Sequence, residues 1–217
     1  EISDYLELKT FGFASGGSGL GGSGAFILSL ISSLSLAFKM NLSVDQIIEK
    51  ACLIEIDRLK KPIGKQDQYL CASKGFSSFT FFNKNNSIRE NNLSIQKKQT
   101  LERLSNDFYL IPTNKKRNSD FGLKKIKEDD ESKDKIIQIR AIASRFIEFE
   151  EERDYKIEEL FNSSVKESWL IKKSMSQVMN QNLQEQYELI DRVVPNSWIR
   201  LLGAGNGGYF LISSKIG

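Results

Sequence analysis

The segment SGGSGLGGSG, residues 15–24, runs without a break into AFILSLISSLSLAF, residues 25–38. Six of the first ten residues are glycine, whereas the apolar run is interrupted only by four serines. This run is typical of a buried helix and is shorter than a bilayer span. The glycine segment before it fits a flexible tether, a dinucleotide-binding turn or a loop that binds another phosphate group. A tether seldom leads into a buried helix without a polar spacer, which favours a ligand-binding loop.

The two best-known glycine patterns for nucleotides do not fit this segment. A Walker A loop places lysine directly after its last glycine, and Ala25 follows Gly24 here. The pattern G-x-G-x-x-G occurs twice in overlapping registers, but it also requires an acidic residue at the end of a strand about 20 positions later. In this sequence that position is Asp45, at the start of a predicted helix. Both patterns are therefore excluded.

What the segment does provide is a set of small residues before the N-terminus of a long helix. Backbone N–H groups there approach an anion closely, and the partial positive charge of the helix favours phosphate. The hydroxyl of Ser18 or Ser23 is in addition suited to reach Mg²⁺. We therefore predict phosphate binding by Gly17, Ser18, Gly19, Leu20, Gly21, Gly22, Ser23 and Gly24.

The composition of the 217 residues limits the chemistry that the protein can carry out. Histidine is absent, which excludes Ser-His-Asp and Cys-His nucleophiles, so acid–base steps fall to Asp, Glu, Lys or Tyr. The 31 basic and 28 acidic residues are scattered, and a net charge of +3 indicates neither a nucleic-acid nor a membrane partner. Cys52 and Cys71 form no CxxC pair, which indicates a reducing, cytoplasmic setting; both are expected in the core.

The hydrophobic pattern predicts an α+β fold. Helices are expected at 25–39, from the capping box of Ser43 and Gln46 to about residue 59, and along three apolar stripes between 136 and 190. Strands are expected at 2–13, 76–82, 108–111, 198–202 and 209–213. The charged run 124–135 is expected to be a solvated connection or the flank of a helix. A second glycine loop, GAGNGG at 203–208, joins the last two strands.

Three motifs, in this order, resemble those of the GHMP kinases, the superfamily of galactokinase, homoserine kinase and mevalonate kinase. They are SGLGGSGAF (18–26), similar to the phosphate loop; PIGKQDQY (62–69), similar to the segment with the catalytic aspartate; and LLGAGNGGYFL (201–211), similar to the C-terminal glycine motif. The stretches GKQDQY, FYLIPTNKKRNS and ESWLIKKSMS most resemble D-glycero-D-manno-heptose 7-phosphate kinases. Gly22 stands where the family has serine. Asn206 stands where it usually has glycine, and Asn tolerates a positive φ better than most residues.

The resemblance implies a two-domain α+β fold. Residues 1–113 would form a ribosomal-protein-like βαβ, ATP-binding N-terminal domain, and residues 114–217 a ferredoxin-like, helix-rich C-terminal domain. The family's N-terminal strand and loop, which carry an arginine, have no counterpart here, and the chain ends soon after the strand that follows GAGNGG. We therefore expect a truncated, internal fragment in which both domains are partial.

The resemblance also implies ATP and Mg²⁺ as cofactors and assigns roles to individual residues. Asp67 would be the general base, and Glu55 would bind Mg²⁺ together with Ser23, with Asp57 as an equally good candidate on its residue type alone. The second loop would approach the transferred phosphoryl group or the sugar through Gly203, Gly205 and Gly207, and it can be a tight hairpin at the same time. For the phosphate already on the sugar, the first candidates are Arg117 and Lys172, ahead of Lys65 and Lys173.

The reaction implied is transfer of the γ-phosphate of ATP to the anomeric hydroxyl of D-glycero-D-manno-heptose 7-phosphate. Two alternatives remain. One is another small-molecule GHMP kinase, similar to galactokinase or fucokinase, and the other is a non-catalytic, ligand-binding member of the fold. The partners would be the sugar phosphate and ATP, without nucleic acid or membrane, and the sequence does not indicate the oligomeric state.

Overall fold

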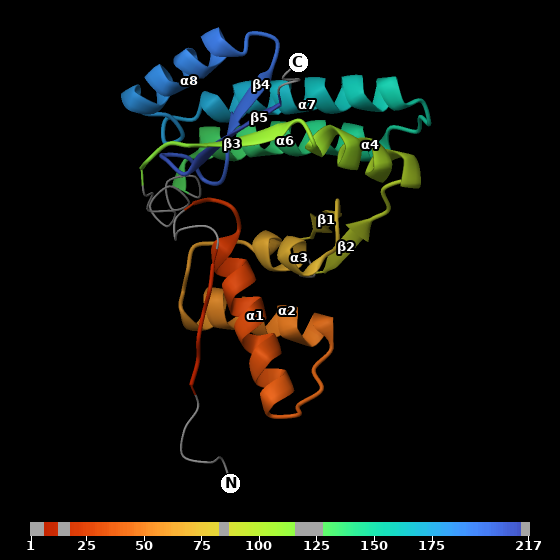
Figure 1. Ribbon diagram of the computed structural model, residues 1–217, viewed down its shortest axis with the longest axis vertical. Coiled ribbons are helices and arrows are strands. Elements are labelled where there is room, and N and C mark those ends of the chain that lie inside the picture. Colours follow the sequence, from red (N-terminus) through yellow and green to blue (C-terminus); the bar gives the residue numbers. More distant parts are fainter. Residues whose placement is uncertain (1–6, 13–17, 83–86, 116–127, 214–217) are drawn as a thin grey trace.

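The computed structural model describes residues 7–12, 18–82, 87–115 and 128–213, and these form an N-terminal and a C-terminal half (Figure 1). The described elements of the N-terminal half are α1 (Gly22–Ala37), α2 (Val44–Cys52), the π-helix η1 (Leu53–Arg58), α3 (Gln66–Ala72), β1 (Ser78–Phe81) and β2 (Ile88–Asn91). Those of the C-terminal half are α4 (Ile95–Ser105), β3 (Phe108–Pro112), α6 (Asp130–Glu148), α7 (Asp154–Lys173), α8 (Gln181–Val193), β4 (Trp198–Leu201) and β5 (Tyr209–Ser213). The mixed helix and sheet content confirms the α+β class.

The apolar run after the glycine segment forms helix α1, as predicted. Its buried positions include Ile27, Leu28 and Ile31, spaced three or four residues apart, and they pack against Ile48 and Ala51 of α2. This spacing is that of one helix face, so the sequence pattern produces the packing directly. At its C-terminal end the helix is followed by a turn in which the buried hydroxyl of Ser35 accepts a hydrogen bond from Leu42 N at 3.1 Å.

Helix α2 begins with the capping box that the sequence predicts. The Ser43 hydroxyl accepts from Gln46 N at 3.2 Å, and the Gln46 side chain accepts from Ser43 N at 2.9 Å. From Leu53 onward the helix changes to a π-helix, which the sequence does not predict. Leu59 N then bonds to the carbonyl oxygen of Ile54 at 2.9 Å, five positions back, so one extra residue is inserted into the turn.

The C-terminal half is a three-stranded antiparallel sheet, in the order β3-β5-β4 within the described residues, packed with helices. Ile111 of β3 and Leu201 of β4 both pair with Phe210 of the central strand. Phe210 is fully buried, and the core around it takes in Trp169 of α7 and Leu183 of α8. Figure 1 shows α6 and α7 running side by side behind this sheet. The strands predicted at 108–111, 198–202 and 209–213 are thus confirmed, as are the helical stripes between 136 and 190.

The way α4 and β3 pack bears on the division between the halves. Strand β3 pairs with β5 along its whole length, and α4 packs against α7, with Arg103 donating to Glu158 at 2.8 Å. A division after residue 113 would separate β3 from its sheet. We therefore propose that the two halves divide between β2 and α4.

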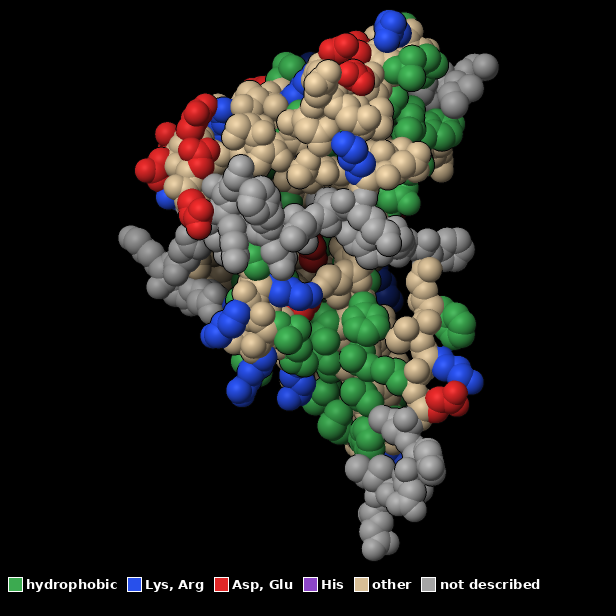
Figure 2. Space-filling model, turned by 90° about the vertical axis from the view of Figure 1, so that its left-hand side faces the viewer, with side chains coloured by type: hydrophobic (Ala, Val, Ile, Leu, Met, Phe, Trp, Pro, Cys, Tyr) green, Lys and Arg blue, Asp and Glu red, His purple; other side chains and the backbone are tan. Residues whose placement is uncertain are grey.

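The segment before the glycine loop differs from the sequence prediction. The described residues 7–12 form no strand, and Phe11 is 94% exposed, because no described strand lies beside them to complete a ladder. The N-terminal half also exposes large apolar side chains of α1 and η1, including Phe26, Leu36 and Leu53, and Figure 2 shows apolar side chains gathered over this half. No helix among the described residues is long and apolar enough to cross a membrane.

Candidate active site

The predicted phosphate loop forms a tight turn at the start of α1. Gly19 and Gly21 have φ values of 85° and 73°, in the left-handed region that favours glycine. Gly21 is the N-cap of α1 and gives no side-chain cap, and the first turn of the helix has no acidic residue. Ser18 is buried, and its hydroxyl accepts from Leu20 N at 3.4 Å. The first turn of α1 therefore starts without a side-chain oxygen on its N–H groups, as an anion site requires. Gly17 lies outside the described residues.

Helix α3 brings Asp67 directly against this loop. A Cβ atom added to Gly24 would lie 3.0 Å from the carbonyl carbon of Asp67 and 3.1 Å from its Cβ, which is tighter than most real Cβ contacts and would require Asp67 to shift by a few tenths of an ångström. One turn further along α3, Cys71 meets Gly21: a Cβ there would lie 3.1 Å from Sγ. Residues 67 and 71 share one face of α3, and that face packs on the loop. The structure thus brings the predicted general base and the predicted phosphate loop together.

The prediction that both cysteines lie in the core is only partly confirmed. Cys52 is buried in the core between α1 and α2, as expected, whereas Cys71 is an exposed residue. Its Sγ lies 3.6 Å from the carbonyl oxygen of Gly21, to which the thiol donates. Burial of the sulfur and then the negative charge of Asp67 raise the pKa of Cys71. Its position at the rim of the loop, with one side open, explains why a core location was wrong.

Glu55 lies beside Ser23, as the resemblance implies. Its side chain is 2% exposed, and it accepts hydrogen bonds from the hydroxyl of Ser23, from Lys61 Nζ at 2.8 Å and from Gln68 Nε2 at 2.6 Å. Burial alone would raise the pKa of this carboxyl, but the bonds from Lys61, Ser23 and Gln68 outweigh it and hold the pKa below its ordinary value. Glu55 is therefore an ionised, buried carboxylate next to the loop. The alternative, Asp57, is exposed on the same π-helix.

The oxygen atoms at this point fit Mg²⁺ only as a partial set of ligands. Glu55 supplies a carboxylate and Ser23 a hydroxyl, both hard donors, and Oε1 of Gln68 is buried without a hydrogen-bond partner among the described residues. No cluster of three or more Asp, Glu, Cys or His side chains able to hold a metal occurs in the described part of the chain. Mg²⁺ is commonly held by one or two protein oxygens together with substrate phosphates and water. The donor set therefore suits an ion that arrives with a phosphate ligand.

The second glycine loop, between β4 and β5, is fixed by the turn that precedes α8. A Cβ on Gly205 would lie 2.6 Å from Val178 Cα, so only glycine fits there. Asn206 adopts a φ of 62°, the positive value that its residue type tolerates, and its N–H donates to the Val178 carbonyl at 2.9 Å. Gly203 and Gly207 also have positive φ values, 70° and 142°. The loop is thus the predicted hairpin connection, held rigidly within the C-terminal half.

The cations predicted for a sugar phosphate lie in different places. Lys172 donates from Nζ to the carbonyl oxygens of Gly203 at 2.5 Å and Leu201 at 3.1 Å, so its ammonium stabilises the start of the second loop. Lys173 lies over the Tyr187 ring, 3.8 Å from the centroid. Lys65 lines a pocket, described next. Arg117 lies outside the described residues.

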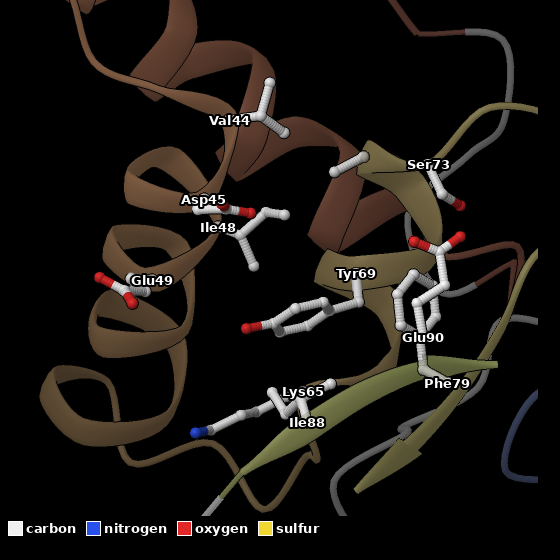
Figure 3. A pocket seen from close by; sticks show the side chains of 11 residues that line it. Val44, Asp45, Ile48, Glu49, Lys65, Tyr69, Ser73, Phe79, Ile88 and Glu90 are labelled. Carbon is white, nitrogen blue, oxygen red and sulfur yellow. The ribbon is translucent and has the colours of Figure 1, made fainter.

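A pocket of about 710 Å³ lies between α2, α3 and the β1–β2 hairpin. Figure 3 shows the ring of Tyr69 pointing between helix α2 and the hairpin, with Asp45, Glu49 and Lys65 around it. Tyr69 lies on the face of α3 opposite to Asp67 and Cys71, because positions two apart on a helix point about 200° apart. The pocket is therefore on the other side of α3 from the phosphate loop.

Sequence reasoning missed Lys61 and the role of Gln68. Lys61 Nζ contacts both Ser23 Oγ, at 2.9 Å, and Glu55 Oε1. The stretch KKPIG reads as a helix break, and nothing in it distinguishes Lys61 from the exposed Lys60. The contact becomes visible only when the π-helix and the following turn are known.

Comparisons with known proteins found similarities both in sequence and in fold. Residues 7–75, which contain the glycine loop, Glu55 and Asp67, match the family model described as GHMP kinases N terminal domain. A protein assigned as a sugar kinase from Campylobacter jejuni has a similar structure, with a TM-score of 0.60 and 26% identity over 93% of this chain and 57% of its own. A D-glycero-D-manno-heptose 1-phosphate kinase from Bacteroides thetaiotaomicron has a TM-score of 0.58, 19% identity, and coverage of 93% of this chain and 55% of its own. No curated protein matches in sequence.

The chain thus spans a little more than half the length of these two structures. At 19% identity the second likeness concerns the fold alone. The match over residues 7–75 and the fold similar to that of a sugar kinase support a relationship of the chain to the GHMP kinase superfamily.

Proposed function

We propose that the protein is an ATP- and Mg²⁺-dependent sugar-phosphate kinase. The observation that carries this proposal is the close packing of Gly24 against Asp67. A Cβ atom added to Gly24 would lie 3.0 Å from the carbonyl carbon of Asp67. This contact supports a carboxylate within reach of a phosphate bound at the start of α1. Positioning and charge neutralisation are what phosphoryl transfer requires from a protein.

In the proposed reaction, the amide groups of Gly21 to Gly24 bind the phosphates of ATP at the positive end of α1. The acceptor hydroxyl oxygen attacks the γ-phosphorus, its proton passes to the Asp67 carboxylate, and the bond from the γ-phosphorus to the β–γ bridging oxygen breaks, releasing ADP. Ser23 and Glu55 would hold Mg²⁺ when it binds with the nucleotide. Bound there, the ion would neutralise charge on the phosphates during transfer.

The proposed acceptor is the anomeric hydroxyl of D-glycero-D-manno-heptose 7-phosphate. The motif resemblance of GKQDQY, FYLIPTNKKRNS and ESWLIKKSMS supports this choice. The phosphate on the acceptor requires a cation, for which Arg117 remains a proposal. Lys172 would serve only by leaving the carbonyl groups of the second loop that it now contacts. The free thiols of Cys52 and Cys71 suit a reducing compartment, so we place the reaction in the cytoplasm.

A comparison of two aspartates tests the proposal. Asp67→Asn removes the proposed base, and Asp57→Asn removes an exposed carboxylate on η1 as a matched control. Transfer from γ-labelled ATP to heptose 7-phosphate should fall at least about 100-fold in the first variant and stay within about twofold in the second. Equal activity of both variants would contradict the role of Asp67.

An acceptor panel separates the remaining alternatives. Transfer to galactose or fucose, but to no heptose phosphate, would retain the kinase and reject the acceptor. Binding of ATP and sugar by calorimetry, without turnover in any acceptor, would instead favour a ligand-binding protein of the same fold.

A further inference from the structure

The ammonium group of Lys61 lies between the two oxygen atoms proposed to bind Mg²⁺. Its Nζ is 2.9 Å from Ser23 Oγ and 2.8 Å from Glu55 Oε1. We propose that Lys61 occupies the cation position of the nucleotide-free protein, an inference that rests on the proposed function for the metal site itself. A divalent ion must then displace this ammonium group before it binds Ser23 and Glu55.

The backbone holds Lys61 in this place. Lys60 has a φ of 53°, which reverses the chain directly after the π-helix, and Lys61 N donates to the carbonyl oxygen of Glu55 at 3.0 Å. The backbone of Lys61 therefore lies beside Glu55, the same residue that its side chain contacts. A regular α-helix through residues 53–58 would end in a different direction, so the π-helix gives this lysine its position.

The charges at Glu55 make the ammonium group and a divalent ion alternatives. A carboxylate that is 2% exposed needs a compensating charge, and either cation supplies it. Both cations together at Oε1 would repel each other at short range. Oε2 keeps its separate bond from Gln68, at 2.6 Å, so the carboxylate stays oriented while the cation at Oε1 changes.

Lys61 is also able to leave without unfolding the protein. Its side chain is 33% exposed, whereas that of Glu55 is almost completely buried. A rotation about its flexible side-chain bonds therefore carries the ammonium group into solvent. The lysine would keep Ser23 and Glu55 in place before nucleotide arrives and would weaken the binding of a free metal ion.

Binding of Mn²⁺ alone to the 217-residue chain, measured by electron paramagnetic resonance, tests this inference. Lys61→Met removes the competing cation, and Lys60→Met removes the same charge from an exposed neighbour. We expect the dissociation constant to fall about tenfold in Lys61→Met, equivalent to about 1.4 kcal/mol, and to change by at most about twofold in Lys60→Met. Lys61→Arg keeps a cation and should bind Mn²⁺ no more tightly than the wild type.

Further variants assign the effect and guard against misfolding. Adding Glu55→Gln to Lys61→Met should abolish the gain in Mn²⁺ affinity. Circular dichroism identifies any variant that fails to fold, and Lys61→Gln then replaces Lys61→Met. Equal Mn²⁺ affinity of the Lys61 and Lys60 variants, or a gain that survives Glu55→Gln, would overturn the inference.

The result is distinguishable from failure of the proposed kinase function. If the wild type shows no nucleotide binding but Lys61→Met still binds Mn²⁺ more tightly, the lysine occupies a cation site and the kinase proposal fails. If nucleotide binds and phosphate is transferred while Lys61→Met leaves Mn²⁺ affinity unchanged, only the role of Lys61 is refuted.

Discussion

Two glycines in the first turn of α1 should respond oppositely to the same substitution. Gly22 and Gly24 are both helical, and neither has a positive φ. A Cβ at Gly22 meets nothing within 4 Å, whereas one at Gly24 lies 3.0, 3.1 and 3.2 Å from three atoms of Asp67. Two of those atoms are backbone, so the neighbour cannot simply rotate away.

The difference in stability between Gly24→Ala and Gly22→Ala follows from two opposing contributions. Replacing glycine by alanine within a helix stabilises the fold by about 0.5–1 kcal/mol, and this gain is similar at both positions. At Gly24 alone, the added methyl group overpacks the contact with α3, which costs about 1–3 kcal/mol. Gly24→Ala should therefore be about 1–3 kcal/mol less stable than Gly22→Ala. For a chain of this size, that difference corresponds to a melting temperature lower by about 2–12 °C.

The same clash should impair function if the contact positions the base. A displacement of Asp67 by a fraction of an ångström to about 1 Å is enough to cost up to about 100-fold in rate. Thermal unfolding of both variants, followed by phosphate transfer from labelled ATP, measures both effects. Gly22→Ala keeps the amide group and should gain stability and lose less activity than Gly24→Ala. Equal melting temperatures for the two variants would refute the packing argument, and equal activities would refute its link to catalysis.

Three further predictions concern single side chains. Saturating MgATP should slow alkylation of Cys71 by iodoacetamide several-fold, because bound phosphates would cover the thiol beside Gly21; an unchanged rate by mass spectrometry would place the nucleotide elsewhere. Glu55→Gln should reduce Mg²⁺-dependent transfer at least about 100-fold, while Asp57→Asn retains it, as activity measured against Mg²⁺ concentration will show. Burial lowers the pKa of Lys97, whose Nζ donates to Ile147 O at 2.7 Å, so the folded protein loses this proton at a lower pH than the unfolded chain. The free energy of unfolding of the wild type should therefore rise relative to Lys97→Met as pH increases toward 10.5, the ordinary lysine value, and denaturant titrations at pH 8 and pH 10 that show no such rise would contradict this.

The sequence predicts the elements whose buried faces are mainly apolar. Helix α1 and the strands β4 and β5 follow from their hydrophobic pattern, and the start of α2 follows from its capping box. Helix α4 is missed because its buried face includes Lys97 and Thr100 beside Leu101 and Leu104, which hides the helical stripe. The strand expected before the glycine loop depends on a ladder partner, which no local pattern supplies.

At the site, residue types are more predictable than their mutual positions. The order of the motifs predicts the glycine loop, Asp67 and the pair of Ser23 and Glu55, and these residues do lie together. The contact of Lys61 depends on the π-helix and on a positive φ at Lys60, neither of which has a local signature. For Lys172 the motif predicts a contact with the phosphate of the sugar, whereas in the structure its ammonium group contacts backbone carbonyl groups of the second loop.

The central claim is that the amide groups at the start of α1 bind a nucleoside triphosphate beside Asp67. A crystal structure of the chain with Mg²⁺ and a non-hydrolysable ATP analogue tests it most directly. The account predicts the phosphates on the N–H groups of Gly21 to Gly24, with the γ-phosphate facing the Asp67 carboxylate. Phosphates bound instead in the pocket around Tyr69, on the other side of α3, would contradict it.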